Sequence, residues 1–427
     1  MPTIQFPYGK TSLPLNIPEE RYAGTLLSQL HHYVPEKGEE QLVRDALSAP
    51  VGSPSLAELA AGKKKVVIIA SDHTRPVPSR IIAPAMLEEI RRGNPDADVT
   101  FLIATGCHRG TTAEELADKF GSEIAANEKI VIHDCDDASM LTDLGELPSG
   151  GRLTVNRLAA EADLLVAEGF IEPHFFAGFS GGRKSVLPGV ASRQTVLYNH
   201  NAAFIADPCA RTGILEGNPI HTDMLWAAKA AKLAFICNVV LDADKKVIYT
   251  VAGDAELAHR AGVEFLCGQC MVSAVPSDIV VTTNGGYPLD QNIYQAVKCM
   301  ATAEATVREG GVIIAAARCN DGHGGEVFHR TFRDNRDLGA LMASFLATPA
   351  EETIVDQWQS QIFARVLLKA SVVFISDAPD ETVRELHMIP AHSMEEALML
   401  ADGILKERGI LNGSILAIPD GVSLVVR

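Results

Sequence analysis

Short continuous runs of apolar residues alternate along the first part of this chain with stretches of helical periodicity. The run from Lys64 to Ala70 has two basic residues followed by unbroken apolar positions, which is typical of a parallel strand buried on both faces. Similar runs follow it, and the strands predicted for this first series are 64–70, 99–104, 129–133, 163–168, 232–240 and 246–251. Strands that alternate with helices of about 10–15 residues form a parallel sheet covered by helices on both faces.

A second series of the same kind begins after Cys270, with predicted strands at 278–282, 311–316, 371–375 and 414–418. The polar, proline-containing stretch 273–278 interrupts the pattern, as a connection between domains does. A chain of 427 residues is also too long for one compact core. We therefore expect an α/β protein with two domains, residues 1–272 and 273–427, each a mainly parallel sheet flanked by helices.

Composition narrows the class of protein. The formal net charge of -17 would repel nucleic acid, although an acidic surface is compatible with a basic pocket for a small anionic substrate. No apolar run is long enough to span a membrane, and the segment 1–10 lacks the basic-then-apolar pattern of a signal peptide. We expect a cytoplasmic protein.

The eight cysteines are scattered, and we expect free thiols in a reducing compartment. Cys267 and Cys270 have the spacing of a metal-binding or redox pair. A structural zinc site needs four ligands, and no second CxxC or HxxxH motif supplies the others. Buried or half-buried thiols are the simpler interpretation.

Polar motifs directly follow several of the predicted strands, where ligands collect in open α/β sheets. After the first strand comes SDHTRP at 71–76, which could aim backbone N–H groups and Arg75 at an anion or could be a capped turn leading into a helix. After the second strand comes TGCHR at 105–109. Its His108 could act as a general acid or base near neutral pH, or could be a hydrogen-bonded loop residue.

A denser motif, EPHFFAGFSGGRKSVLPG at 172–189, follows another strand. Its glycines allow close backbone approach, while Arg183 and Lys184 supply positive charge. A phosphate-binding P-loop is excluded, because counting from Gly178 places Arg183 where the second glycine is required. The helical pattern of 190–200 ends at His200, and a single histidine does not make a metal site without further ligands.

The last motif, NGGYPLDQNIYQAVK at 284–298, follows the first strand of the second series. Tyr294 and Lys298 are an i,i+4 pair on one side of a predicted helix, and Gln295 lies beside them. A hydroxyl, an amide and an ammonium group together suit recognition of a carboxylate. Taken alone, the same pattern is also typical of an amphipathic helix with a solvated polar face.

Together these motifs identify a resemblance that covers essentially the whole chain. SDHTRP at 71–76, TGCHR at 105–109, the block 172–189, His200 and YPLDQNIYQAVK at 287–298 resemble the nickel-pincer nucleotide-dependent lactate racemases. The resemblance implies a cofactor, a nickel(II) pyridinium-3,5-bisthiocarboxylic acid mononucleotide, attached covalently at Lys184. It also implies that His200 is the protein's ligand to the nickel, the other three donors coming from the cofactor, in a planar arrangement that suits Ni(II).

The same resemblance implies a role for each remaining candidate. His108 and His174 would be the catalytic acid and base. The cofactor would be contacted by Asp72, His73, Thr74 and Arg75. The substrate would be bound by Arg75, Tyr294, Gln295, Lys298 and Trp358, of which Trp358 lies outside the matching blocks and could simply be a core residue.

The implied reaction interconverts D- and L-lactate, or another small 2-hydroxy acid, by proton-coupled hydride transfer through a 2-keto acid, with the active site in the cleft between the domains. Cofactor-maturation enzymes would be partners. Two other functions are weighed against it. An NAD-dependent 2-hydroxy acid dehydrogenase is disfavoured because no GxGxxG motif follows the first strand. A noncatalytic carrier of the cofactor would leave two acid–base histidines at strand ends without a purpose.

Overall fold

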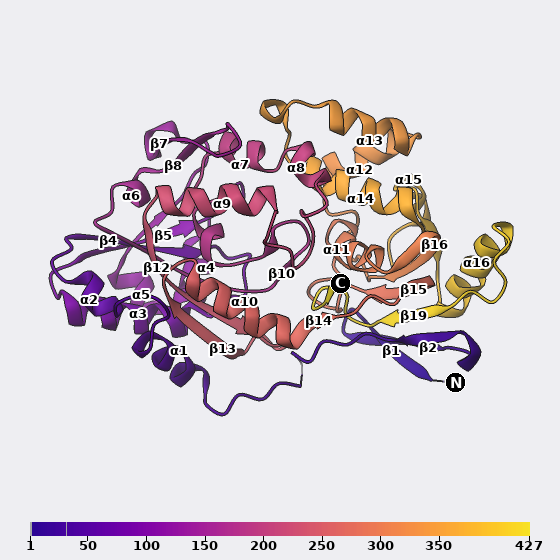
Figure 1. The fold of residues 1–427 in the computed structure, drawn as a ribbon, viewed down its shortest axis with the longest axis horizontal. Helices are drawn as coiled ribbons and strands as arrows, with labels where there is room; N and C mark the ends of the chain where they lie inside the picture. Colours follow the sequence, from indigo (N-terminus) through magenta and orange to yellow (C-terminus); the bar gives the residue numbers. More distant parts are fainter. Residues whose placement is uncertain (1, 31) are drawn as a thin grey trace. The chain divides into compact units, whose positions relative to one another are not determined.

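The computed structural model describes residues 2–30 and 32–427, which form two compact units (Figure 1). Residues 29–200 and 207–269 make up one of them, here called the central unit. Residues up to 28, 201–206 and 270–427 make up the other, here called the terminal unit. Both are α/β units, as the alternating pattern predicted.

The central unit is built on a six-stranded sheet with strand order β13-β12-β9-β4-β5-β6. Its strands are β4 (Lys65–Ser71), β5 (Asp98–Ala104), β6 (Lys129–Ile132), β9 (Leu164–Phe170), β12 (Leu233–Leu241) and β13 (Val247–Gly253). Neighbours are parallel, except that β13 is antiparallel to β12. Each strand of the first predicted series is therefore present, with ends displaced by at most a few residues.

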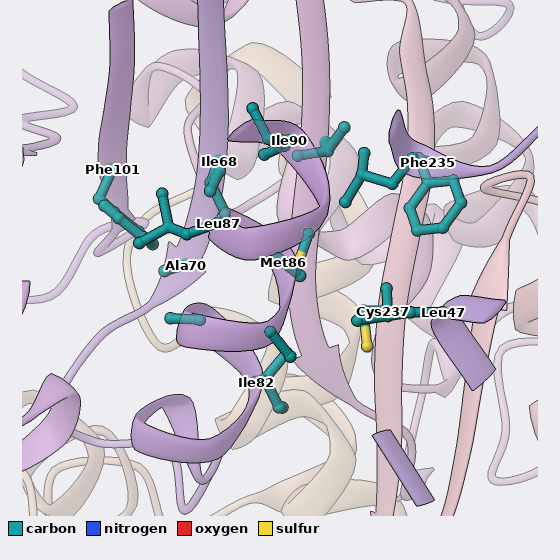
Figure 2. Close-up of a cluster of buried hydrophobic side chains, with 14 of the residues drawn as sticks. Leu47, Ile68, Ala70, Ile82, Met86, Leu87, Ile90, Phe101, Phe235 and Cys237 are labelled. Atoms are coloured by element: carbon teal, nitrogen blue, oxygen red, sulfur yellow. The ribbon is translucent and has the colours of Figure 1, made fainter. Parts of the chain in front are cut away.

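Helices cover both faces of this sheet, which explains the unbroken apolar runs. On one face, α1 (Glu39–Ser48), α2 (Leu56–Ala60) and α3 (Ser79–Gly93) pack on alternate strand residues. Figure 2 shows Met86 and Ile90 of α3 against this face. The opposite face is contacted by α9 (Pro219–Ala230) and by the 3-10 turn η3 (Gly182–Ser185). The glycine-rich motif therefore lies directly on the sheet.

Shorter elements complete the central unit. They are α4 (Ala113–Phe120), α5 (Ser122–Asn127), β7 (Leu141–Glu146), β8 (Arg152–Asn156), α6 (Arg157–Ala160), β10 (Pro173–His174), β11 (Gly178–Phe179), α7 (Arg193–Asn199) and α10 (Leu257–Cys270). A capping box between Thr112 and Glu115 starts α4 and satisfies backbone N–H groups at its first turn.

The terminal unit contains a second six-stranded sheet, with order β18-β17-β16-β15-β19-β3 and all neighbours parallel. Its strands are β3 (Tyr22–Thr25), β15 (Ser277–Thr283), β16 (Val307–Ala316), β17 (Ser371–Ile375), β18 (Ile389–Ala391) and β19 (Ile415–Ile418). The helix α16 (Met394–Glu407) packs on one face. The other face is contacted by α11 (Ile293–Glu304) and α14 (Gln357–Lys369).

The remaining elements of the terminal unit are β1 (Thr3–Tyr8), β2 (Thr11–Asn16), α8 (Ala202–Ala206), β14 (Met271–Val272), α12 (Glu326–Arg333), α13 (Leu338–Ala347), α15 (Asp380–Glu385) and β20 (Val425–Val426). Among the residues described, no helix is both long enough and apolar enough to cross a membrane.

The N-terminal segment differs from the expected division into 1–272 and 273–427. Strand β3 pairs with β19 at the edge of the terminal sheet, and Phe6, Leu15 and Ile17 are buried in the core of that unit. The first 28 residues therefore belong to the same compact unit as 270–427. The pattern of apolar runs could not reveal this, because β3 is short and its partner strand is at the other end of the chain.

Candidate functional site

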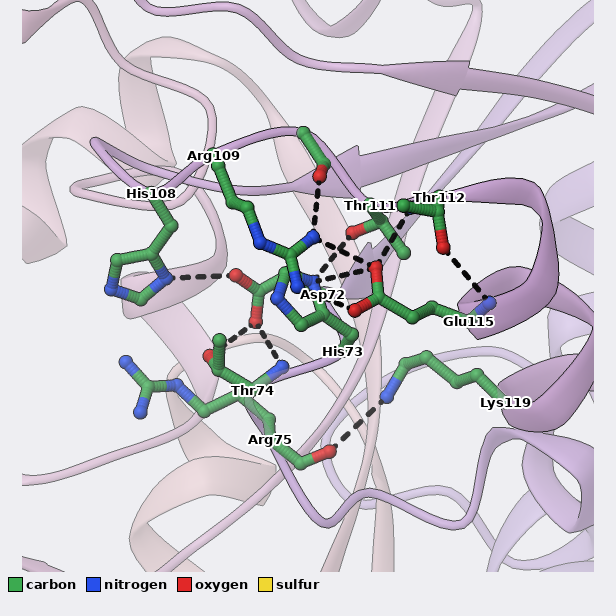
Figure 3. Close-up of polar contacts among 11 residues, drawn as sticks. Asp72, His73, Thr74, Arg75, His108, Arg109, Thr111, Thr112, Glu115 and Lys119 are labelled. Carbon is green, nitrogen blue, oxygen red and sulfur yellow. Dashed lines mark hydrogen bonds and ion pairs between the residues drawn. The ribbon is translucent and has the colours of Figure 1, made fainter. Parts of the chain in front are cut away.

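Two loops at the carboxyl ends of the neighbouring strands β4 and β5 bring Asp72 and His108 together (Figure 3). Asp72 is 1% exposed, and one of its carboxylate oxygens lies 2.8 Å from Nδ1 of His108. The other oxygen accepts hydrogen bonds from the backbone N–H and the hydroxyl of Thr74 at 3.1 and 2.6 Å. Burial alone would raise the pKa of Asp72, but the hydrogen bonds from His108 and Thr74 outweigh it and lower the pKa.

This contact determines which ring nitrogen of His108 can react. An ionised carboxylate only accepts hydrogen bonds, so Nδ1 of His108 carries a proton and, in the neutral ring, Nε2 carries the lone pair. The side chain of His108 is 45% exposed, and a molecule outside the protein can reach it. Nε2 of His108 could therefore accept a proton from a bound molecule.

The other residues of the 71–76 motif have different surroundings. The ring of His73 lies 3.1 Å from the hydroxyl of Thr111 and 3.7 Å from a carboxylate oxygen of Glu115, so it faces the start of α4. The guanidinium group of Arg75 extends on the side of His108 in Figure 3. Within the described ranges 2–30 and 32–427 it forms no hydrogen bond or ion pair, and it is exposed. Arg75 is thus a cation available to an anionic ligand.

His174 and Lys184 meet in the loop after β9. Strands β10 and β11 form a tight hairpin, in which Nδ1 of His174 accepts the backbone N–H of Ala177 at 3.2 Å. In the neutral ring the proton therefore lies on Nε2, which is 3.4 Å from Nζ of Lys184. Burial lowers the pKa of Lys184 well below its usual value, and the charges of Arg183 and Arg75 lower it further. A neutral lysine is a nucleophile.

His200 lies close to the same hairpin. It is 4% exposed and directly follows α7. Burial, followed by the charge of Lys184, lowers its pKa to about 3, and a neutral imidazole is the form that binds a metal. The ring of Phe176 lies between the two histidines, with its centroid 4.5 Å from that of His174 and 5.1 Å from that of His200.

Two clusters of His, Cys, Asp or Glu in the described part of the chain are close enough to share a metal ion. They are His323, Glu326 and His329, and Asp134, Cys135 and Asp136. Neither includes His200.

Arg183 holds the glycine-rich loop in place, and sequence reasoning gave it no such role. Its guanidinium group is 1% exposed and donates to the carbonyl of Ala177 at 2.8 Å. It also donates to Nδ1 of His221 at 3.0 Å and lies 2.9 Å from Nε2 of His259. Nothing in the sequence indicated the two histidines, because they lie on separate helices that only the tertiary fold brings together.

Gly178 lets this loop approach its neighbours closely. Its φ is +77°, and a Cβ atom there would lie 2.4 Å from the carbonyl oxygen of Ile214. Only glycine tolerates both the backbone conformation and the contact. The glycine in the motif thus shapes the hairpin that carries His174.

In the terminal unit, the start of α11 carries Tyr294, Gln295 and Lys298, all partly exposed. The hydroxyl of Tyr294 donates to Asp356 at 2.7 Å. Trp358 is on α14, two residues after Asp356, and is also partly exposed. Asp356 was not among the candidates, because only the packing of α14 on α11 places it beside Tyr294.

The α/β scaffold thus places His108, His174 and a lysine of lowered pKa, Lys184, in loops that follow parallel strands. Comparison with known proteins gives the family. Residues 8–213 match the lactate racemase N-terminal domain and residues 272–426 match the lactate racemase C-terminal domain. The chain therefore belongs to the lactate racemase family, whose members are isomerases.

Individual relatives agree with this assignment over their full lengths. The chain is 52% identical to a lactate racemase of Thermoanaerobacterium thermosaccharolyticum and 50% identical to one of Lactiplantibacillus plantarum, covering 100% of each chain in both cases. The structure of the lactate racemase apoprotein from Thermoanaerobacterium thermosaccharolyticum superimposes with a TM-score of 0.95, again with both chains fully covered. A Thermotoga maritima protein, 20% identical, shares the fold with a TM-score of 0.63 over 91% of this chain and 98% of its own.

Proposed function

We propose that this chain racemises lactate, or another small 2-hydroxy acid, by proton-coupled hydride transfer with a nickel-pincer nucleotide attached to Lys184. The observation that carries the proposal is the constellation of Asp72 with His108 and of His174 with Lys184, in a chain 50–52% identical to lactate racemases. We further propose that it acts in the cytoplasm and receives its cofactor from maturation enzymes.

The residues present fit the proposed cofactor. The depressed pKa of Lys184 suits an amine that must attack the carbon of a thiocarboxyl group, forming the C–N bond of a thioamide while the carbonyl oxygen leaves as water. His200 is buried, and its pKa is lowered to about 3, which leaves a neutral imidazole able to bind the metal of the cofactor. Arg75 and Thr74 would contact the nucleotide beside Asp72. When bound, the cofactor supplies the metal and a ring carbon that accepts the substrate's Cα hydrogen as a hydride and returns it.

The two histidines divide the proton transfers. Loss of a hydride from Cα and of the hydroxyl proton converts a 2-hydroxy acid into a planar 2-keto acid, whose two faces can each regain hydrogen. His108 presents a lone pair at Nε2 and is set to take the hydroxyl proton, because Asp72 holds the proton on Nδ1. His174 presents N–H at Nε2, because Nδ1 accepts from Ala177. One histidine is therefore set as a base and the other as an acid.

Substrate binding is proposed for Arg75, Tyr294, Gln295, Lys298 and Trp358. The exposed guanidinium of Arg75 suits a carboxylate. Lys298, one turn after Tyr294 on α11, offers a second positive charge. The indole of Trp358 would exclude water from the reacting carbon.

The proposal is tested on protein produced together with the cofactor-maturation enzymes. We expect a covalent mass increase on Lys184, one bound nickel, and racemisation starting from either D- or L-lactate. Lys184→Arg should abolish the adduct. In D2O the Cα hydrogen should be retained in the product, because a hydride does not exchange with solvent as an abstracted proton would.

Each failure has a distinct meaning. Matured protein with no adduct on Lys184 and no racemisation of any 2-hydroxy acid contradicts the proposal. Oxidation of a 2-hydroxy acid with free NAD and without nickel indicates a dehydrogenase. An adduct with no activity on a panel of 2-hydroxy acids indicates a carrier of the cofactor.

A further inference from the structure

The residue before α14 has an unusual conformation. Asp356 has φ 66° and ψ 1°, in the left-handed region, which residues other than glycine seldom occupy because it is strained. Asp at the N-cap position of a helix ordinarily accepts a hydrogen bond from the first turn. The Asp356 side chain forms no such bond. Its conformation therefore serves something other than the start of the helix.

The carboxylate instead holds a residue on another helix. Oδ1 of Asp356 accepts the hydroxyl proton of Tyr294 at 2.7 Å. Three residues later, Nε2 of Gln359, which is 1% exposed, donates to the backbone carbonyl of Tyr294 at 2.6 Å. Both ends of Tyr294 are thus held by the first turn of α14, the turn that also carries Trp358.

This arrangement limits what the Tyr294 hydroxyl can do. A phenol has one proton and two lone pairs, and here the proton is donated to Asp356. Toward any other molecule the oxygen can then only accept. A carboxylate at neutral pH has no proton to donate, whereas the 2-hydroxyl group of a 2-hydroxy acid has one.

We propose that Asp356 is a positioning residue that accepts the hydroxyl proton of Tyr294. The Tyr294 oxygen would then accept a hydrogen bond from the 2-hydroxyl group of the substrate and would not donate one to the substrate's carboxylate. The inference rests on the proposed function, since it concerns how a 2-hydroxy acid is recognised. It gives Tyr294 a different role from Lys298 and Arg75, whose positive charges suit the substrate's carboxylate. A substrate lacking the hydroxyl would lose this contact.

The kinetic test uses matured enzyme and three variants. Asp356→Gly removes the carboxylate and keeps a residue that tolerates φ 66°, Asp356→Asn keeps an oxygen acceptor, and Tyr294→Phe removes the hydroxyl. We expect Asp356→Gly and Tyr294→Phe each to raise KM for lactate several-fold, up to about tenfold, as loss of a hydrogen bond between neutral groups does. Asp356→Asn should stay within a few-fold of wild type, and Asp356→Gly should add little to Tyr294→Phe.

Two comparisons make the result specific. Asn412→Gly, at another left-handed residue of the terminal unit (φ 54°), controls for the backbone change and should leave KM unaltered. Propionate, a carboxylate without the hydroxyl, should inhibit Asp356→Gly and wild type equally. If its inhibition constant rises as much as the KM for lactate, Tyr294 binds the carboxylate and the inference is overturned. The fraction of protein that carries the adduct on Lys184 is measured in every variant, so that differences in cofactor content do not affect the comparison.

A third measurement does not depend on turnover. Burial, together with the charge and hydrogen bond of Asp356, raises the pKa of Tyr294 above its usual value. In unloaded protein, absorbance titration of Asp356→Gly should show one tyrosine ionising at lower pH than in wild type, and adding Tyr294→Phe to that variant should remove the signal. An unchanged titration overturns the inference. If matured wild type does not racemise any 2-hydroxy acid but the expected shift in tyrosine ionisation is seen, only the proposed function is contradicted.

Discussion

Replacing Asp72 with asparagine should impair His108 without displacing it. The substitution keeps an oxygen that can accept from Thr74, but it places an amide N–H₂ near Nδ1 of His108, where a carboxylate oxygen now lies at 2.8 Å. An N–H₂ group can only donate, so the neutral ring must expose its lone pair at Nδ1 and carry its proton on Nε2. The nitrogen that faces outward would then be unable to accept a proton.

The size of the effect follows from the bond that is lost. A hydrogen bond to a charged, buried partner is worth about 1.5–3 kcal/mol, and Asp72 is 1% exposed, so little solvent screens it. At about 1.4 kcal/mol for each factor of ten, kcat should fall about 10- to 100-fold. The fall should occur from both D- and L-lactate, because each turnover uses both histidines.

The assay is racemisation of each enantiomer, normalised to the amount of adduct on Lys184. Thr105→Val is the matched control, since it removes a 2.6 Å hydrogen bond to the carbonyl of His133 in the loop that carries His108 and leaves the contact between Asp72 and His108. It should cost much less activity than Asp72→Asn. Wild-type kcat in Asp72→Asn would refute the assignment of Asp72 as the residue that orients His108.

Two further predictions concern stability. Burial, and then the charge of Arg183, lower the pKa of His221 to about 3, below the value of about 6.5 in the unfolded chain. Between these two pH values only the unfolded chain binds a proton at this histidine. The free energy of unfolding should therefore fall as the pH drops through this range, by up to about 1.4 kcal/mol per pH unit. His221→Asn keeps an acceptor for Arg183 and should make stability depend less on pH. The measurement is the denaturant midpoint of each protein at about pH 7 and about pH 5. An equal change of midpoint in wild type and variant would contradict the prediction. Gly178→Ala should destabilise the fold more than Gly62→Ala, because both have positive φ but only the former meets a backbone atom, at 2.4 Å, while nothing lies within 4 Å of the latter. Thermal melting compares the two, and equal losses would show that the contact has no cost.

Much of the scaffold could be predicted from the sequence, because buried parallel strands have a strong local signal. Strands β4, β9 and β12 are mainly apolar and almost entirely buried, and the sequence pattern predicts each of them within a few residues. Strand β3, with the sequence YAGT, is half-buried at a sheet edge and has no such signal. Its place depends on pairing with β19, which no local pattern encodes.

The candidate site divides in the same way. Parallel strands end at the same edge of a sheet, and this rule alone predicts that Asp72, His108 and His174 lie at that edge. It could not show that Asp72 holds Nδ1 of His108 or that His174 faces Lys184, since these depend on loop conformation. Asp356 was missed for a similar reason, because its partner lies on a different helix.

The order in which the chain is synthesised gives the edge strand β3 a further consequence. It leaves the ribosome before the whole central unit, whereas β19, the strand with which it pairs, is made almost last. Strand β3 therefore stays without its partner strand until synthesis is nearly complete. A gene divided near residue 270 would therefore not yield two self-sufficient halves. The first product would carry the unpaired strand β3, which could pair with other chains. The second product would have an uncovered sheet edge unless the two were made together.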